Sequence, residues 1–157
     1  MLEKVDVFRI FLDSETATTE LETKGEYEYD INLPSKKNQY TKIIMYVDNF
    51  NICLRGLGTG DVVVNLLNVS QYNSYNSRTG GNNPVICSVY NDNTATGRTN
   101  DLVLSYQGAT TPISINQVPT HLSLSLTDID NVGIDLSNAQ NFWNINMRLE
   151  CFYEEEC

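Results

Sequence analysis

The chain has 157 residues, of which 41% are hydrophobic and 19% are charged, and its formal net charge is −10. This length suits one globular domain spanning residues 1–157, and the composition excludes the disordered class, which is poor in hydrophobic residues and rich in charge. An acidic surface repels phosphate, and the sequence has no cluster of Lys and Arg. We therefore expect no direct binding of nucleic acid.

The sequence also predicts a soluble protein that is not secreted. It begins MLEKVDVFRIFLD, in which charged and apolar residues alternate. No stretch approaches the roughly 18 consecutive apolar residues that a membrane span requires. We expect neither a membrane span nor a secretory signal.

Strand-like patterns run along the whole chain. In residues 26–33, Tyr27, Tyr29 and Ile31 fall on one face, and acidic or amide residues fall on the other. This alternation is typical of a half-buried strand. The expected strands, in chain order, cover residues 5–12, 26–33, 40–54, 61–69, 84–90, 101–106, 112–115, 121–127 and 143–153. Short strands separated by turn-rich stretches predict an all-β protein with an antiparallel β-sandwich or barrel.

The last expected strand carries the single tryptophan of the chain. Trp143 starts a run in which apolar residues alternate with polar ones, and we expect its side chain in the core. This strand and residues 5–12 are both long, and we expect one or both to form sheet edges that a neighbouring subunit can extend.

The stretches between strands are polar and are expected to be surface loops. Residues 14–24 are rich in threonine and lack an apolar stripe, and residues 135–140 could form one helical turn at most. Residues 70–83 and 91–100 consist mainly of Asn, Ser, Thr and Gly, which suit turns. In the first of these two loops, Tyr72, Tyr75 and Arg78 are candidate interface residues, because Tyr and Arg are enriched at interfaces. The two tyrosines could equally cover the end of the sandwich.

No catalytic residue, metal ligand or cofactor site is predicted. His121 is the only histidine, and no nucleophile motif accompanies it. The segment from Asp128 to Asp135 spaces oxygen donors somewhat like a calcium loop, but Asx turns between strands account for it. The four cysteines form no CxxC pair, which argues against a thiolate metal site. Two of them, Cys53 and Cys87, lie in apolar runs and are expected to be buried, while the redox state of Cys53, Cys87, Cys151 and Cys157 stays open.

Residues 113–150 read ISINQVPTHLSLSLTDIDNVGIDLSNAQNFWNINMRLE. A proline-led strand with alternating leucines passes through an acidic turn to a final strand with a tryptophan. This segment resembles the end of the small single jelly-roll capsid proteins, of the minor capsid or penton type, of large eukaryotic DNA viruses and polinton-like viruses. The matching positions are Pro119, Leu122, Leu124, Asp128, Asp130, Gly133 and Trp143.

The resemblance implies an eight-stranded jelly roll in two four-stranded sheets. It also implies a structural virion component, located in the capsid, that acts as a minor capsid protein and assembles with or cements other capsid subunits. Its partners would be other capsid proteins and further copies of the chain, as a trimer or pentamer. Three alternatives stay open: a penton protein at the vertex, a lectin-like or receptor-binding β-sandwich that uses the loop of Tyr72, Tyr75 and Arg78, and a hydrolase on the same scaffold. We expect that the protein is not an enzyme.

Overall fold

A computed structural model describes residues 1–34, 39–54, 60–68, 74–91, 102–107, 112–138 and 141–154, without the side chains of residues 60, 91 and 102–107. Eight of the described strands have five or more residues: β1 (Leu2–Asp13), β3 (Glu26–Asp30), β4 (Lys42–Leu54), β5 (Gly60–Leu66), β8 (Val85–Asn91), β9 (Leu102–Gln107), β11 (His121–Thr127) and β12 (Phe142–Glu154). The shorter elements are β2 (Thr19–Leu21), the 3-10 turn η1 (Glu22–Lys24), β6 (Ser74–Asn76), β7 (Gly81–Asn83) and β10 (Ile113–Ile115).

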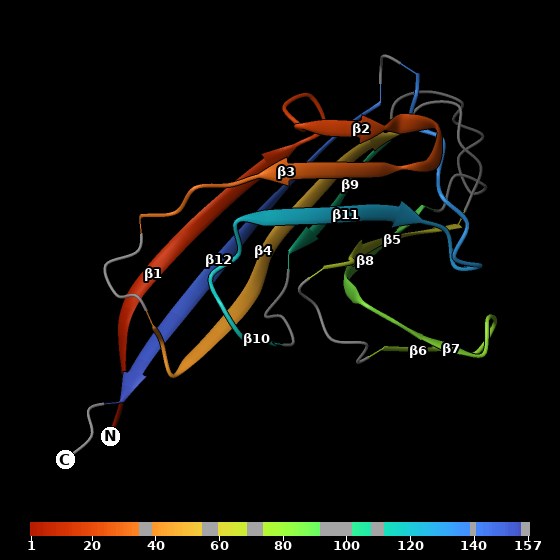
Figure 1. The fold of residues 1–157 in the computed structure, drawn as a ribbon. Helices are drawn as coiled ribbons and strands as arrows, with labels where there is room; N and C mark the ends of the chain where they lie inside the picture. The colour runs from red at the N-terminus through yellow and green to blue at the C-terminus, as the bar shows by residue number, and fades with distance from the viewer. Residues whose placement is uncertain are drawn as a thin grey trace.

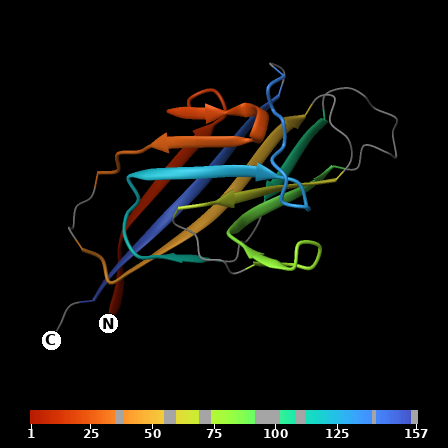
Figure 2. The ribbon, with the colours of Figure 1, turned by 45° about the vertical axis from the view of Figure 1, so that its right-hand side comes forward.

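The strands form two packed antiparallel sheets and one small hairpin. The first sheet has the order β1-β12-β4-β10, with β9 also paired to β4. The second sheet has the order β2-β3-β11-β5-β8, and β6 pairs with β7. Figure 1 shows the second sheet in front of the first, with its strands running obliquely to those behind, and the start of β1 beside the end of β12 at one end of the first sheet. The rotated view in Figure 2 shows the same crossing of the two layers.

The connectivity is that of a jelly roll. In the first sheet β12 is inserted between β1 and β4, and in the second β11 is inserted between β3 and β5. Strands from the two ends of the chain therefore lie side by side, as two interlocked Greek keys require. The predicted antiparallel sandwich is confirmed. Each sheet has five strands and not the expected four, because the short strands β2 and β10 extend them.

Two of the expected loops contain regular structure. Residues 14–24 include β2 and η1. The strand β2 forms backbone hydrogen bonds with β3, and this pairing leaves no pattern within residues 14–24 themselves. Residues 70–83 include the β6–β7 hairpin in their described part. The described part of residues 135–140 forms no helical turn. The backbone N–H of Leu136 donates instead to the backbone carbonyl oxygen of Glu22 at 2.9 Å. The expected loop at residues 91–100 lies almost entirely outside the described residues.

One β-bulge corrects the phase of β4. In the first half of the strand Ile43, Met45 and Val47 face the core, and in the second half the inward residues are Phe50, Ile52 and Leu54. The register with β12 shifts at this point, which leaves Asp48 as the additional residue. A bulge adds one residue to a strand and restores the inward face beyond it. The strand thus keeps apolar residues in the core along its whole length.

The core contains the single tryptophan, as predicted. Trp143 is 1% exposed, and its indole makes edge contacts with the rings of Tyr27 and Tyr29. Of the two long strands from which one or both sheet edges were expected, β1 lies at an edge and β12 lies inside the sheet. Because β12 pairs with β1 on one side and β4 on the other, its backbone groups are used within the sheet.

Candidate functional site

The β6–β7 hairpin covers part of the outer face of the second sheet. Val63 of β5 is buried although it lies outside the main core cluster. Between the hairpin and the sheet lies a hollow of about 400 Å³. Its lining residues are Val63, Ser74, Tyr75, Asn76, Ser77, Arg78, Asn83, Val85, Ser88, Thr127, Asp128 and Ile129. Its volume lies in the range of roughly 300 to 1,000 Å³ typical of small-molecule sites.

The rim of this hollow is held to a neighbouring turn by two polar contacts. Arg78 Nε lies 3.0 Å from Asp130 Oδ1, and Asn76 Nδ2 donates to the carbonyl of Ile129 at 2.6 Å. Tyr75 projects from the hairpin and is 72% exposed. Both partners of the ion pair are well exposed, so we expect little stability from it. The guanidinium group of Arg78 and the ring of Tyr75 therefore lie on the same rim of the hollow.

The structure brings two of the three predicted interface residues together. Tyr75 and Arg78 lie on the same hairpin and line the same hollow, and Tyr72 lies outside the described residues. Sequence reasoning missed that Asp130 and Ile129 complete this rim. They lie about fifty residues further along the chain, and no local pattern connects the two segments.

The acidic turn after β11 uses its carboxylate for its own backbone. Asp128 Oδ1 accepts hydrogen bonds from the N–H groups of Asp130 at 2.9 Å and Val132 at 3.0 Å. Asn131 has a φ of 63°, which asparagine tolerates better than most residues. The predicted Asx turn is therefore confirmed. Within the described residues there is no group of three or more His, Cys, Asp and Glu side chains placed to hold a metal ion.

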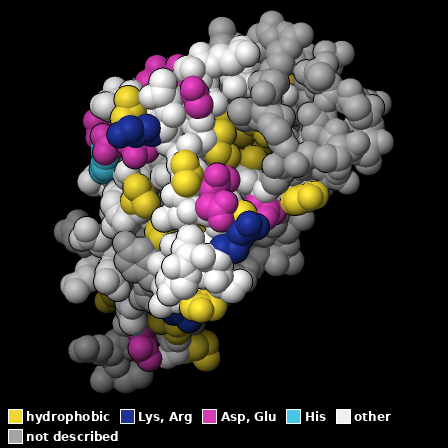
Figure 3. Space-filling model, turned by 90° about the vertical axis from the view of Figure 1, so that its right-hand side faces the viewer, with side chains coloured by type: hydrophobic (Ala, Val, Ile, Leu, Met, Phe, Trp, Pro, Cys, Tyr) yellow, Lys and Arg dark blue, Asp and Glu magenta, His cyan; other side chains and the backbone are white. Residues whose placement is uncertain are grey.

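His121 lies on the outer face of the second sheet between two carboxylates. Its Nδ1 is 2.9 Å from Asp30 Oδ1, and its Nε2 is 3.7 Å from Glu28 Oε1. The hydrogen bond to Asp30 raises the pKa of His121 above its ordinary value. In Figure 3 the histidine, in cyan, borders a group of acidic side chains, and hydrophobic side chains lie in small groups among polar ones. This arrangement favours a protonated ring, which is a poor general base.

The described cysteines are free thiols. Burial raises the pKa of Cys87 to about 12 and the pKa of Cys151 to about 11. Cys53 is half-buried on the outward side of β4, so the expectation of burial is correct for Cys87 and wrong for Cys53. Cys157 lies outside the described residues. A thiol with so high a pKa is almost entirely protonated at neutral pH and is a weak nucleophile.

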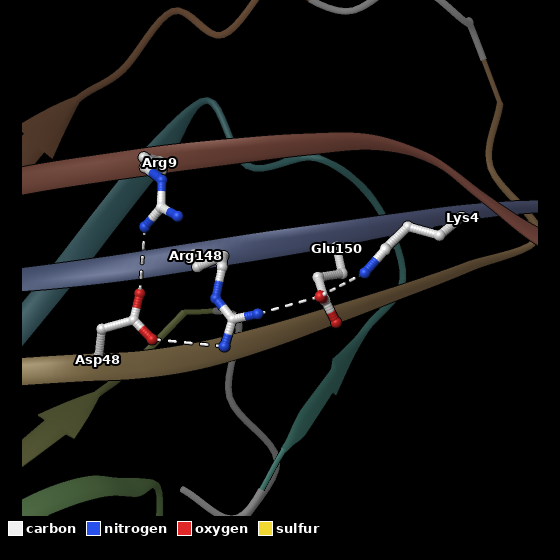
Figure 4. A network of polar contacts seen from close by, with 5 residues as sticks. All are labelled: Lys4, Arg9, Asp48, Arg148 and Glu150. Atoms are coloured by element: carbon white, nitrogen blue, oxygen red, sulfur yellow. Dashed lines mark hydrogen bonds and ion pairs between the residues drawn. The ribbon is translucent and has the colours of Figure 1, made fainter. Parts of the chain in front are cut away.

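A charged network crosses the outer face of the first sheet (Figure 4). Glu150 accepts contacts from Lys4 and Arg148, both at 3.0 Å, and Asp48 lies 3.4 Å from Arg148 and 3.6 Å from Arg9. The hydrogen bond from Lys4 is the main reason why the pKa of Glu150 is lowered. The bulge positions Asp48 between the two arginines. The network therefore links side chains of β1, β12 and β4 across the sheet.

Comparison with known proteins gives no family. No family model matches the chain, and no curated protein matches it. Among solved structures, the chain is similar to the protein in the cryo-EM structure of a virus-like particle of the extra small virus of the giant freshwater prawn Macrobrachium rosenbergii. The similarity covers 96% of this chain and 80% of that one, at 11% identity and a TM-score of 0.29. We draw no functional conclusion from a likeness at this level.

None of the described helical segments is long and apolar enough to cross a membrane.

Proposed function

We propose that the protein is a structural component of a virion, a minor capsid protein that assembles with other capsid subunits and does not catalyse a reaction. The jelly roll supports this proposal, because viral capsid domains are among the proteins built on this architecture. Lectins and other proteins share the fold, however, so a function has to be argued from the surface.

The free edge of β1 is the observation that carries the proposal. Among the described residues, β1 pairs on one side only, with β12. Its outward side chains include Val7, which is 47% exposed. A long edge strand presents unpaired backbone N–H and C=O groups to which another chain can add a strand. Exposed apolar side chains beside such an edge add a surface that a neighbouring subunit can bury.

The test is the mass of the purified protein, measured by size-exclusion chromatography with light scattering over a range of concentrations. We expect a closed trimer or pentamer of the 17.7 kDa chain. Val7→Lys should shift the protein toward monomer, because a lysine on an edge strand opposes strand addition. Leu21→Lys is the matched control, since Leu21 is similarly exposed on β2, the edge of the other sheet. A monomer at every concentration, or equal effects of both variants, would contradict assembly through β1.

The same measurement separates the minor capsid role from the penton alternative. A pentamer has the symmetry of an icosahedral vertex and would favour the penton protein. A trimer would favour the minor capsid protein. Electron microscopy of the oligomer would show its symmetry directly.

A receptor-binding or lectin-like module is the second candidate function. Tyr75 favours it, because a highly exposed tyrosine beside Arg78 on one rim is typical of a protein interface. Under this alternative the isolated monomer binds a protein or glycan, and Tyr75→Ala abolishes the binding. Under the capsid proposal Tyr75→Ala leaves the oligomeric mass unchanged.

A further inference from the structure

A second hollow, on the outer face of the first sheet, is lined mostly by amide and aromatic side chains. It has a volume of about 420 Å³ and lies between β1, β12 and β4. Its lining residues are Phe11, Leu12, Asp13, Asn49, Asn51, Phe142, Asn144 and Asn146. No residue of this set was predicted as a site from the sequence.

The strand register constructs this surface in two rows. Each row takes one residue from each of the three strands: Phe11, Asn146 and Asn49 in the first row, and Asp13, Asn144 and Asn51 in the second. Neighbouring strands lie about 4.8 Å apart, so each row spans about 10 Å. The side chains therefore project from sheet backbone, which is more rigid than a loop.

The bulge in β4 is what turns two of the asparagines outward. Ile43, Met45 and Val47 face the core, so an unbroken alternation would point Asn49 and Asn51 inward as well. The additional residue, Asp48, reverses the phase, and both amides face the hollow. The same irregularity keeps Phe50 and Ile52 in the core.

The amides orient one another. Asn51 Nδ2 donates to Asn144 Oδ1 at 2.9 Å and to Asn49 Oδ1 at 3.4 Å. The amides of Asn144 and Asn146 each carry both donors and acceptors, so they suit a ligand with hydroxyl groups. All four asparagines of the hollow are partly exposed. The surface therefore suits a ligand that has many paired donors and acceptors.

The charge and the aromatic rings narrow the class of ligand. Among the lining residues that the structure describes, only Asp13 is charged, and it makes an anionic ligand unfavourable. Phe11 exposes an apolar ring in the same row as Asn146, and Phe142 is half-buried nearby. A pyranose sugar matches this combination, because its ring has an apolar face of C–H groups and a rim of hydroxyl groups that each donate and accept.

We propose that this hollow binds a neutral saccharide. One sugar ring stacks on Phe11, and its hydroxyl groups exchange hydrogen bonds with the amides of Asn146 and Asn144. This inference does not depend on the capsid role, since a sugar site of this kind can serve an assembled shell or a single chain.

The test is saturation-transfer NMR on the full chain with methyl glycosides of glucose, galactose, mannose and N-acetylglucosamine, and with lactose. We expect transfer to at least one of these saccharides. Phe11→Ala and Asn146→Ala should each weaken that binding about tenfold, which corresponds to about 1.4 kcal/mol. Tyr75→Ala is the matched control, because it removes another exposed ring on the hairpin of the other sheet and should leave the binding unchanged.

Three results would overturn this assignment. The first is that the folded protein shows no transfer to any of the saccharides. The second is binding that survives both Phe11→Ala and Asn146→Ala, or that is lost with Tyr75→Ala instead. The third is that no saccharide binds and that Phe11→Ala lowers the oligomeric mass measured by light scattering. That result would show that a second copy of the chain covers this surface. Circular dichroism of each variant establishes that it is folded.

Discussion

Replacing Trp143 by alanine measures how much the aromatic core contributes to stability. The ring centroid of Trp143 lies 5.0 Å from that of Tyr27 and 6.2 Å from those of Tyr29 and Phe50. Truncating a buried tryptophan costs about 3 to 5 kcal/mol, because burial of the side chain is lost and a cavity remains. For a chain of this size, the loss corresponds to a fall in Tm of roughly 6 to 20 °C.

Unfolding in urea, followed by circular dichroism, provides the assay. Fluorescence is unsuitable because Trp143 is the only tryptophan. Phe11→Ala is the control, since truncating an exposed ring should change the free energy of unfolding by no more than about 0.5 kcal/mol. If Trp143→Ala does not fold, Trp143→Phe provides a milder test, because it keeps an aromatic ring in the core and leaves a smaller cavity. A loss below about 1 kcal/mol for Trp143→Ala would refute the central place of this ring in the core.

Three further predictions concern the turn, the histidine and a buried thiol. Gly133→Ala should lower the free energy of unfolding by about 1 to 3 kcal/mol, because a Cβ there would lie 2.2 Å from the carbonyl oxygen of Lys24. His121 has a raised pKa in the folded state, so its pairing with Asp30 stabilises the protein fully below the unfolded pKa of about 6.5 and is lost as the pH rises through the folded pKa. Iodoacetamide should leave Cys87 unlabelled in the native protein, since burial raises its pKa to about 12.

Each of these has a measurement that can contradict it. Gly81→Ala is the control for the turn, because nothing lies within 4 Å of a Cβ built there, and equal urea midpoints for the two glycine variants would contradict the steric account. For the histidine, the pH profile of wild-type stability is compared with that of His121→Gln, and identical profiles would exclude its contribution. For the thiol, mass spectrometry after labelling compares native with urea-unfolded protein, and equal labelling of Cys87 in both would contradict its burial.

The strands were predictable because burial on one face leaves a local trace. The alternation in residues 26–33 and 143–153 needs only neighbouring side chains, and it correctly indicated β3, β12 and the buried Trp143. The Asx turn at Asp128 was predictable for the same reason, since the side chain bonds to N–H groups within four residues. The short strands β2, β6 and β7 were missed because three residues are too few to show a period.

The two hollows were not predictable, because each depends on which strands become neighbours. Asn51 and Asn144 are 93 positions apart in the sequence. Only the β4–β12 register places Asn51 Nδ2 2.9 Å from Asn144 Oδ1. In the hairpin hollow, Tyr75 and Arg78 were predicted from residue type alone, while the partner Asp130 came from a distant turn.

By itself, then, the sequence determined the all-β class, the strand positions and the apolar face of most strands, since these follow from alternation along a single segment. The tertiary structure alone decided the strand order, the free edge at β1 and the outward direction of Asn49 and Asn51. Strand order and register depend on long-range backbone hydrogen bonds. Because nearly every residue offers the same backbone donor and acceptor, the local sequence of a strand does not determine which other strand pairs with it.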